Sequence, residues 1–185
     1  MKHNSVGRKL AIGAASGAAA TIPMSWAMEV MHQLLPPHEQ QPLPPREITE
    51  RITSLMRIGD RLSNEQRMWI ALASHFGYGA AVGSVYQTIA PSVPMHPLAK
   101  GTAYGLAVWA GSYLGLLPGL GILTPATRHR ARRNLLMIAA HLVWGSALGL
   151  VTDLLQRGSR GQVQFLDERH EADVNSAEIP AGARV

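Results

Sequence analysis

Residues 135–155 read LLMIAAHLVWGSALGLVTDLL, and this stretch decides the class of fold. It contains no lysine or arginine, and its only ionisable side chains are His141 and Asp153. An α-helix rises about 1.5 Å per residue, so a stretch of this length crosses a hydrocarbon core of roughly 30 Å. Inside lipid the backbone must satisfy its own hydrogen bonds, which favours a helix. The stretch therefore predicts a membrane-spanning helix.

Three further windows, 10–31, 68–90 and 101–123, are of similar length and also lack lysine and arginine. Charged residues make up 16% of the chain, against about 25% in typical soluble proteins. We therefore predict an all-α integral membrane protein with one transmembrane domain, residues 10–156. Its four helices are expected at about 10–35, 64–90, 98–120 and 134–156.

The segments before and after this domain are polar. Residues 1–9 form a basic N-terminal segment that resembles the start of a signal peptide, but the apolar run continues to Met31. This continuation favours an uncleaved helix. The tail, residues 157–185, is polar and mixed in charge, so we expect it to be disordered.

The connection between the first two helices contains two structural signals. Five prolines between 36 and 45 end the first helix, and apolar residues then recur at helical spacing from Ile48 to Met56. This pattern predicts a short amphipathic helix at about 46–58, lying on the membrane surface or packed on the bundle. Ser63-Asn-Glu-Gln66 is a capping box that should start the second helix.

A basic cluster precedes the last helix. It consists of Arg128, Arg130, Arg132 and Arg133, with no acidic residue among them. Such a cluster can bind anionic lipid headgroups or simply fix the topology, and it favours a cytoplasmic position for this connection. The lipid bilayer is therefore an expected partner, and nucleic acid is not.

Two of the helices share a motif. His75-Phe-Gly-Tyr-Gly-Ala-Ala-Val-Gly83 and His141-Leu-Val-Trp-Gly-Ser-Ala-Leu-Gly149 both fit His-x-x-aromatic-Gly-small-Ala-x-Gly, 66 residues apart. The second and fourth helices run in the same direction through the membrane. The motif therefore indicates two similar helical hairpins.

Small residues four apart occur in every predicted helix and allow helix backbones to approach closely. We expect a tightly packed bundle that can associate with a second copy or with another membrane protein. The glycines predicted to pack are Gly13, Gly17, Gly79, Gly83, Gly111, Gly115, Gly145 and Gly149.

Three polar residues, Glu29, His75 and His141, fall at one level, roughly 10 Å inside the same membrane face. Their simplest role is hydrogen bonding between helices. One alternative is a proton or ion path. Another is a bis-histidine haem site or a metal site of two histidines and one carboxylate.

Catalysis is not expected, because the chain has no recognised catalytic motif and no cysteine. No resident cofactor is expected either, unless the two histidines hold haem or a metal.

Several segments resemble a known family. They are Gly17-Ala-Ala-Ala-Thr-Ile-Pro-Met24, Leu43-Pro-Pro-Arg-Glu-Ile-Thr-Glu-Arg51, His75-Phe-Gly-Tyr-Gly79, Ala107-Val-Trp-Ala-Gly-Ser-Tyr-Leu-Gly115 and Ala126-Thr-Arg-His-Arg-Ala-Arg-Arg-Asn134. Together they resemble the YagU-type group of uncharacterised bacterial inner-membrane proteins over about residues 10–155. The resemblance implies a multipass protein of the bacterial inner membrane, and it brings no assigned activity or catalytic residue.

Overall fold

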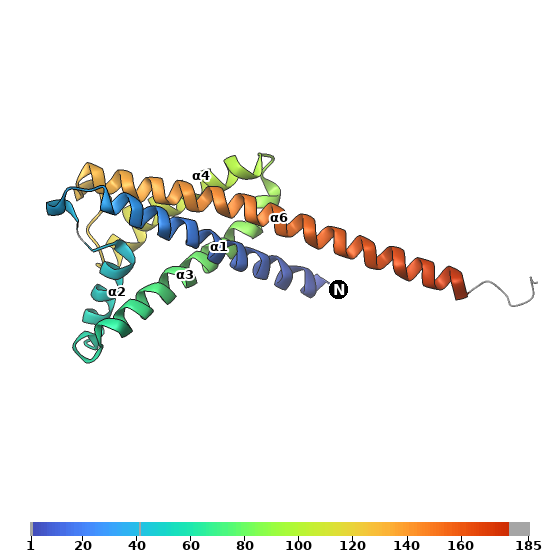
Figure 1. Ribbon diagram of the computed structural model, residues 1–185, viewed down its shortest axis with the longest axis horizontal. Helices are drawn as coiled ribbons and strands as arrows, with labels where there is room; N and C mark the ends of the chain where they lie inside the picture. The colour runs from blue at the N-terminus through green and yellow to red at the C-terminus, as the bar shows by residue number, and fades with distance from the viewer. Residues whose placement is uncertain (1, 41, 178–185) are drawn as a thin grey trace, which may run out of the picture.

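A computed structural model describes residues 2–40 and 42–177 of the protein (Figure 1). Over these residues the chain is helical, with no strand. The main helices are α1 (Lys2–Gln33), α2 (Pro44–Leu55), α3 (Asn64–Ile89), α4 (Pro97–Ala110), α5 (Leu117–Gly119) and α6 (Ala131–Ala177). A π-helical turn, η4 (Gly111–Leu116), joins α4 to α5. Short 3₁₀ turns lie at Pro37–Glu39, Gly59–Arg61, Ala90–Ser92 and Ala126–Arg128.

The ends of the helices follow local signals in the sequence. The predicted capping box is confirmed: Gln66 N–H donates to Ser63 Oγ (3.2 Å), and Ser63 N–H donates to Gln66 Oε1 (2.8 Å). Pro44 occupies the first position of α2, where its missing N–H costs nothing.

Both outer ends of the bundle differ from the sequence expectation. α1 begins at Lys2, within the segment expected to precede the first helix. α6 continues through Ala177, whereas the composition predicts disorder from residue 157. No proline interrupts the sequence between the predicted span and Pro180. Asp153 and Arg157, one helical turn apart, form an ion pair (2.8 Å) that stabilises the helix where the predicted span ends. The part of the predicted tail from 178 to 185 lies outside the described residues.

The third predicted helix is continuous from residue 97 to 119 but changes its winding. Leu117 N–H donates to the carbonyl of Ser112, five residues back, which is the π-helical pattern. Pro118 follows at once and has no N–H to donate to the carbonyl of Leu114. The turn widens where the regular α-helical pattern is interrupted, and single π turns are frequent at functional sites.

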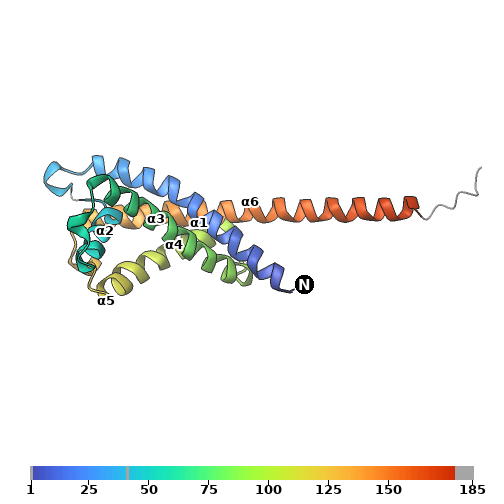
Figure 2. The same cartoon turned by 90° about the horizontal axis from the view of Figure 1, so that it is seen from below.

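The bundle consists of two antiparallel helix pairs, α1 with α3 and α4 with α6, joined where α1 packs on α6. Figure 2 shows α2 and α5 at one end of the bundle, with the N-terminus and the long extension of α6 toward the other. In the first pair Gly13 lies against Gly83 and Gly17 against Gly79. These contacts bring two helix backbones together without intervening side chains.

The second pair repeats this arrangement. A Cβ atom added to Gly101 would lie only 2.8 Å from the Cα of Gly149, and one added to Gly105 would overlap the carbonyl oxygen of His141. Real Cβ atoms essentially never approach other atoms this closely, so the crossing of α4 and α6 requires glycine at both positions. Tight crossings of this kind are typical of helices that associate in membranes.

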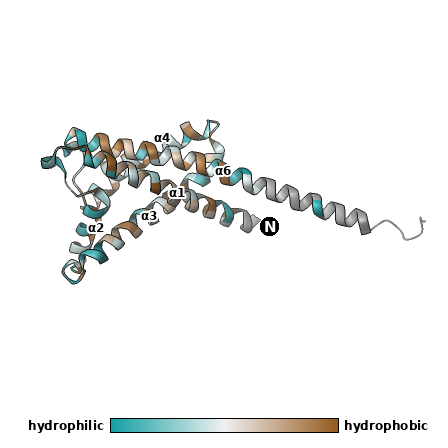
Figure 3. Ribbon diagram, viewed as in Figure 1, coloured by the Kyte–Doolittle hydropathy of each residue, from teal (hydrophilic) through white to brown (hydrophobic). Residues whose placement is uncertain are grey.

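The outer surface of the bundle is rich in large apolar side chains. Figure 3 shows hydrophobic residues along the middle of α1, α4 and α6. Exposed examples are Ile22, Trp26, Trp69, Val85, Leu106, Leu114, Leu150 and Leu154. Two helical segments, Val6–Gln33 and Ala131–Ser159, are long and apolar enough to span a membrane.

Candidate functional site: an apolar cavity lined by two histidines

One end of the bundle is opened by the divergence of α3. Its N-terminal half runs away from α1 and α6, and α2 lies beside it (Figure 1). The space between them contains a cavity of about 310 Å³. Its walls come from α1, α2, α3, α6 and the α4–η4–α5 segment. Elements far apart in the sequence therefore form one site.

Among the residues that the structure describes, those of the cavity wall are mostly apolar and include no lysine, arginine, aspartate or glutamate. Its aliphatic part includes Met24, Met28, Ile48, Leu116, Leu117 and Met137. Five aromatic or imidazole rings also line it: His75, Tyr78, Tyr113, His141 and Trp144. Burying an unpaired charge in such surroundings is costly, so the wall suits an uncharged occupant.

Most hydroxyl groups of the wall are already hydrogen-bonded. Thr21 and Thr53 donate to backbone carbonyls one turn back in their own helices (2.9 Å each). Tyr78 Oη and Ser112 Oγ lie 2.8 Å apart and share one hydrogen bond between α3 and η4. A pair of hydroxyls has two hydrogens, so this bond leaves one O–H available.

The two histidines differ in their partners. His141 is buried, and its Nδ1 lies 2.8 Å from the carbonyl oxygen of Met137. Because a carbonyl only accepts, Nδ1 carries the hydrogen, and in the uncharged ring Nε2 presents a lone pair. The ring of Tyr113 packs edge-on against His141, with centroids 5.9 Å apart. His75 Nε2 is buried and has no hydrogen-bond partner within the described part of the chain.

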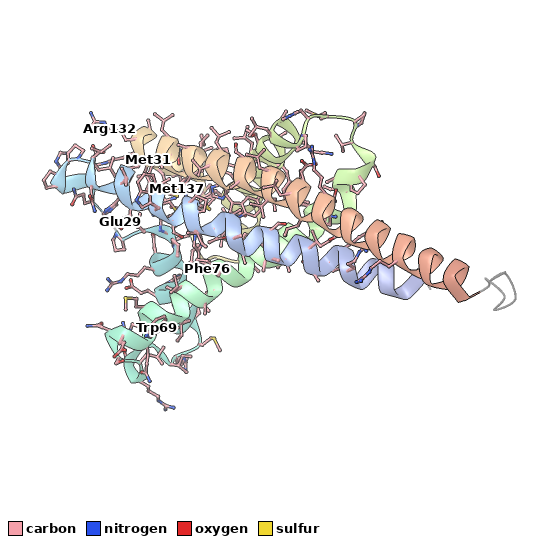
Figure 4. The ribbon with its side chains drawn as sticks, turned by 45° about the vertical axis from the view of Figure 1, so that its right-hand side comes forward. Glu29, Met31, Trp69, Phe76, Arg132 and Met137 are labelled. Carbon is pink, nitrogen blue, oxygen red and sulfur yellow. The ribbon has the colours of Figure 1, made fainter. Side chains whose placement is uncertain are left out.

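Glu29 lies apart from the two histidines. It is exposed on α1, it does not line the cavity, and its carboxylate accepts a hydrogen bond from Gln33 (3.0 Å). Figure 4 shows Glu29 near the end of α1 that carries Met31. Among the residues that the structure describes, no group of three or more His, Cys, Asp or Glu could hold a metal.

The helical repeat explains the position of Glu29. Residues four apart advance by about 40° around an α-helix, so Glu29 is rotated by roughly 160° from Gly13, four steps earlier. Gly13, Gly17 and Thr21 are buried, Ser25 is partly exposed and Glu29 is exposed.

Six of the eight predicted packing glycines, in α1, α3 and α6, lie at the helix crossings described above. Gly111 and Gly115 instead lie exposed in η4, and a Cβ added to either would have nothing within 4 Å. The glycines of α4 that pack are Gly101 and Gly105, and neither was predicted from the sequence. Their spacing of four residues was a visible signal, but Gly101 and Gly105 lie on a different face of the helix from the series that was predicted to pack.

The arginine cluster contacts acidic residues in the connection between α1 and α3. Arg130 and Arg132 each lie 3.6 Å from Glu39, and Arg133 pairs with Glu47 of α2. These ion pairs tie the start of α6 to α2 and its flanking turn. Arg128 is exposed.

A comparison with protein families gives one match, over residues 21–150, to the family described as protein of unknown function (DUF1440). The chain belongs to the DUF1440 family. No curated protein and no solved structure matches the chain.

The DUF1440 region contains the whole cavity, whose lining residues run from Thr21 to Trp144. His75 and His141 were predicted from the sequence, but the aromatic residues beside them were not. A signal for two of these was present, because Tyr78 and Trp144 fill the shared aromatic position of the repeated motif. Ser112 and Tyr113 carry no such signal, because η4 brings them to the cavity.

Proposed function

We propose that this DUF1440 protein is a multipass protein of the bacterial inner membrane in which α1, α3, α4–η4–α5 and α6 all cross the bilayer. One observation carries the proposal: large apolar side chains face outward on every one of these helices, while glycines occupy the crossings inside. A water-soluble bundle would bury most of these large apolar side chains.

The lengths of the two less apolar helices agree with this topology. Residues 97–119 are continuously helical and would extend about 34 Å at 1.5 Å per residue, and the 26 residues of α3 would extend about 39 Å. Both exceed a hydrocarbon core of roughly 30 Å. The resemblance to the YagU-type group supports the inner membrane as the location.

The absence of cysteine makes the topology directly testable. We expect Ser92→Cys to react with a membrane-impermeant maleimide in intact bacterial cells, and Thr127→Cys and Ser54→Cys to react only after lysis. This follows from the cytoplasmic position proposed for the arginine cluster. Leu150→Cys, in the middle of α6, should stay unlabelled until detergent is added. Rapid labelling of Leu150→Cys without detergent would contradict the proposal.

The proposed role of the protein is association through small-residue faces, without catalysis. The six packing glycines of α1, α3 and α6 are used inside the chain, but one small-residue face of α4 and η4 is exposed. It consists of Ala99, Ala103, Ala107, Gly111 and Gly115. Such a face allows a second helix to approach closely.

A cysteine at position 107 tests whether a second copy occupies this face. We expect Ala107→Cys to form a disulfide-linked dimer in oxidised membranes, and Leu155→Cys, exposed on α6, to remain monomeric. Equal crosslinking of the two variants would count against association through α4.

The sequence offered two alternative functions for Glu29, His75 and His141, a proton or ion path and a haem or metal site. A proton relay loses its carboxylate, because Glu29 is exposed and away from the cavity. Haem or metal binding would rest on His75 and His141 alone, and an absorption spectrum of the purified protein tests it.

A further inference from the structure

The cavity has an entrance that suits molecules dissolved in lipid. Several of its lining residues are also substantially exposed, and they come from α2, α3, η4 and the residue after α5: Ile52, Ile70, Tyr78, Leu116 and Leu120. All are apolar except for the hydroxyl of Tyr78. A charged or strongly polar molecule would have to give up its hydration to pass such an entrance, whereas an apolar molecule would not.

Inside the cavity, His141 determines which polar group an occupant must carry. Its Nδ1 is engaged with the carbonyl of Met137, so the nitrogen left for an occupant is Nε2, an acceptor. The Tyr78–Ser112 pair, which lines the same cavity, retains one O–H donor. A hydroxyl group on the ligand can donate to His141 Nε2, and the cavity offers a donor for a further lone pair of the ligand.

The rings of the wall favour a planar ring in the ligand. His75, Tyr78, Tyr113 and Trp144 come from α3, η4 and α6 and surround the same space as His141. Aromatic rings attract one another in offset or edge-to-face arrangements beyond the effect of area alone.

We infer that this cavity binds an uncharged lipid-soluble phenol: a hydroxylated aromatic ring inside the cavity, with an alkyl chain leaving between Leu116 and Leu120 into the lipid. His141 Nε2 accepts the phenolic hydrogen. The ring lies among the aromatic residues, and no charge is needed on either side. This ligand assignment goes beyond the proposed function, and it depends on the membrane topology only for the route of entry.

The test is a competition between two ligands, a phenol and the ether in which a methyl group replaces the hydroxyl hydrogen. The full-length protein in detergent is mixed with equal amounts of para-octylphenol and its methyl ether, para-octylanisole, and bound ligand is quantified by native mass spectrometry. We expect a preference of about tenfold for the phenol, because the ether leaves the buried acceptor unpaired. His141→Leu should reduce that preference to less than about twofold.

Variants at the entrance keep the test informative if His141→Leu fails to fold. Leu120→Trp should block binding of both compounds, since Leu120 is 60% exposed and lines the cavity. Leu135→Trp is the matched control, because Leu135 is 64% exposed on α6 and does not line the cavity. Unchanged binding by Leu120→Trp would overturn the site.

Other outcomes would overturn the ligand class. Equal binding of phenol and ether by the wild-type protein would refute the role of His141. Equal competition by dodecanol would refute the ring. A Soret band in the purified protein, lost in His141→Leu, would assign the cavity to haem instead. None of these results depends on the cysteine labelling, so the ligand proposal and the membrane proposal can fail separately.

Discussion

Replacing Gly83 with alanine tests the crossing of α1 and α3. The new Cβ would lie 2.7 Å from the Cα of Gly17, whereas ordinary contact begins at 3.4 Å, so the backbones must separate by at least about 0.7 Å. A gap of this size forfeits a quarter to a half of each dispersion contact, and overpacking of a close interface costs roughly 1–3 kcal/mol. Alanine also favours a helix over glycine by about 1 kcal/mol, which acts in the opposite direction.

A second glycine of α3 separates these two effects. Gly77 has nothing within 4 Å of an added Cβ, so Gly77→Ala reports the helix preference alone. We expect Gly83→Ala to be less stable than Gly77→Ala by about 1–3 kcal/mol. The free energy of unfolding would be measured by titrating detergent-solubilised protein with sodium dodecyl sulfate and following helix content by circular dichroism. Equal stability of the two variants would refute the close crossing.

Three further variants test contacts in other parts of the bundle. Tyr104→Phe removes the hydrogen bond to the carbonyl of Val82 (2.7 Å) and should lower the free energy of unfolding by about 0.5–1.5 kcal/mol in the same titration. Ser63→Ala removes the cap of α3 and should cost about 1 kcal/mol, with faster hydrogen exchange confined to the first turn. Glu47→Gln breaks the ion pair with Arg133, and we expect faster proteolysis around α2. Unchanged cleavage would mean that this pair does not hold α2 in place.

Parts of the candidate site could be predicted from the sequence. The shared motif placed His75 and His141 at one level on helices of the same direction, and both line the cavity. The acceptor role of His141 could not be predicted, because it depends on a hydrogen bond to Met137 in the folded helix. The depth of a residue along a helix follows from counting, but its direction around the axis does not.

The sequence by itself determined where the helices form and where they end at the connections between them, but not how far α1 and α6 extend at the two ends of the chain. Runs of apolar residues, the prolines after α1 and the capping box at Ser63 act on neighbours within one or two turns, so they need no knowledge of the fold. Only the tertiary structure decided which face of α4 meets α6 and which predicted polar residues face the interior. The packing of Gly101 and Gly105 rather than Gly111 and Gly115, the outward position of Glu29 and the cavity beside the diverging α3 all depend on helices distant in sequence. A helix can rotate about its axis without changing its own hydrogen bonds, and only contact with its partners fixes that rotation.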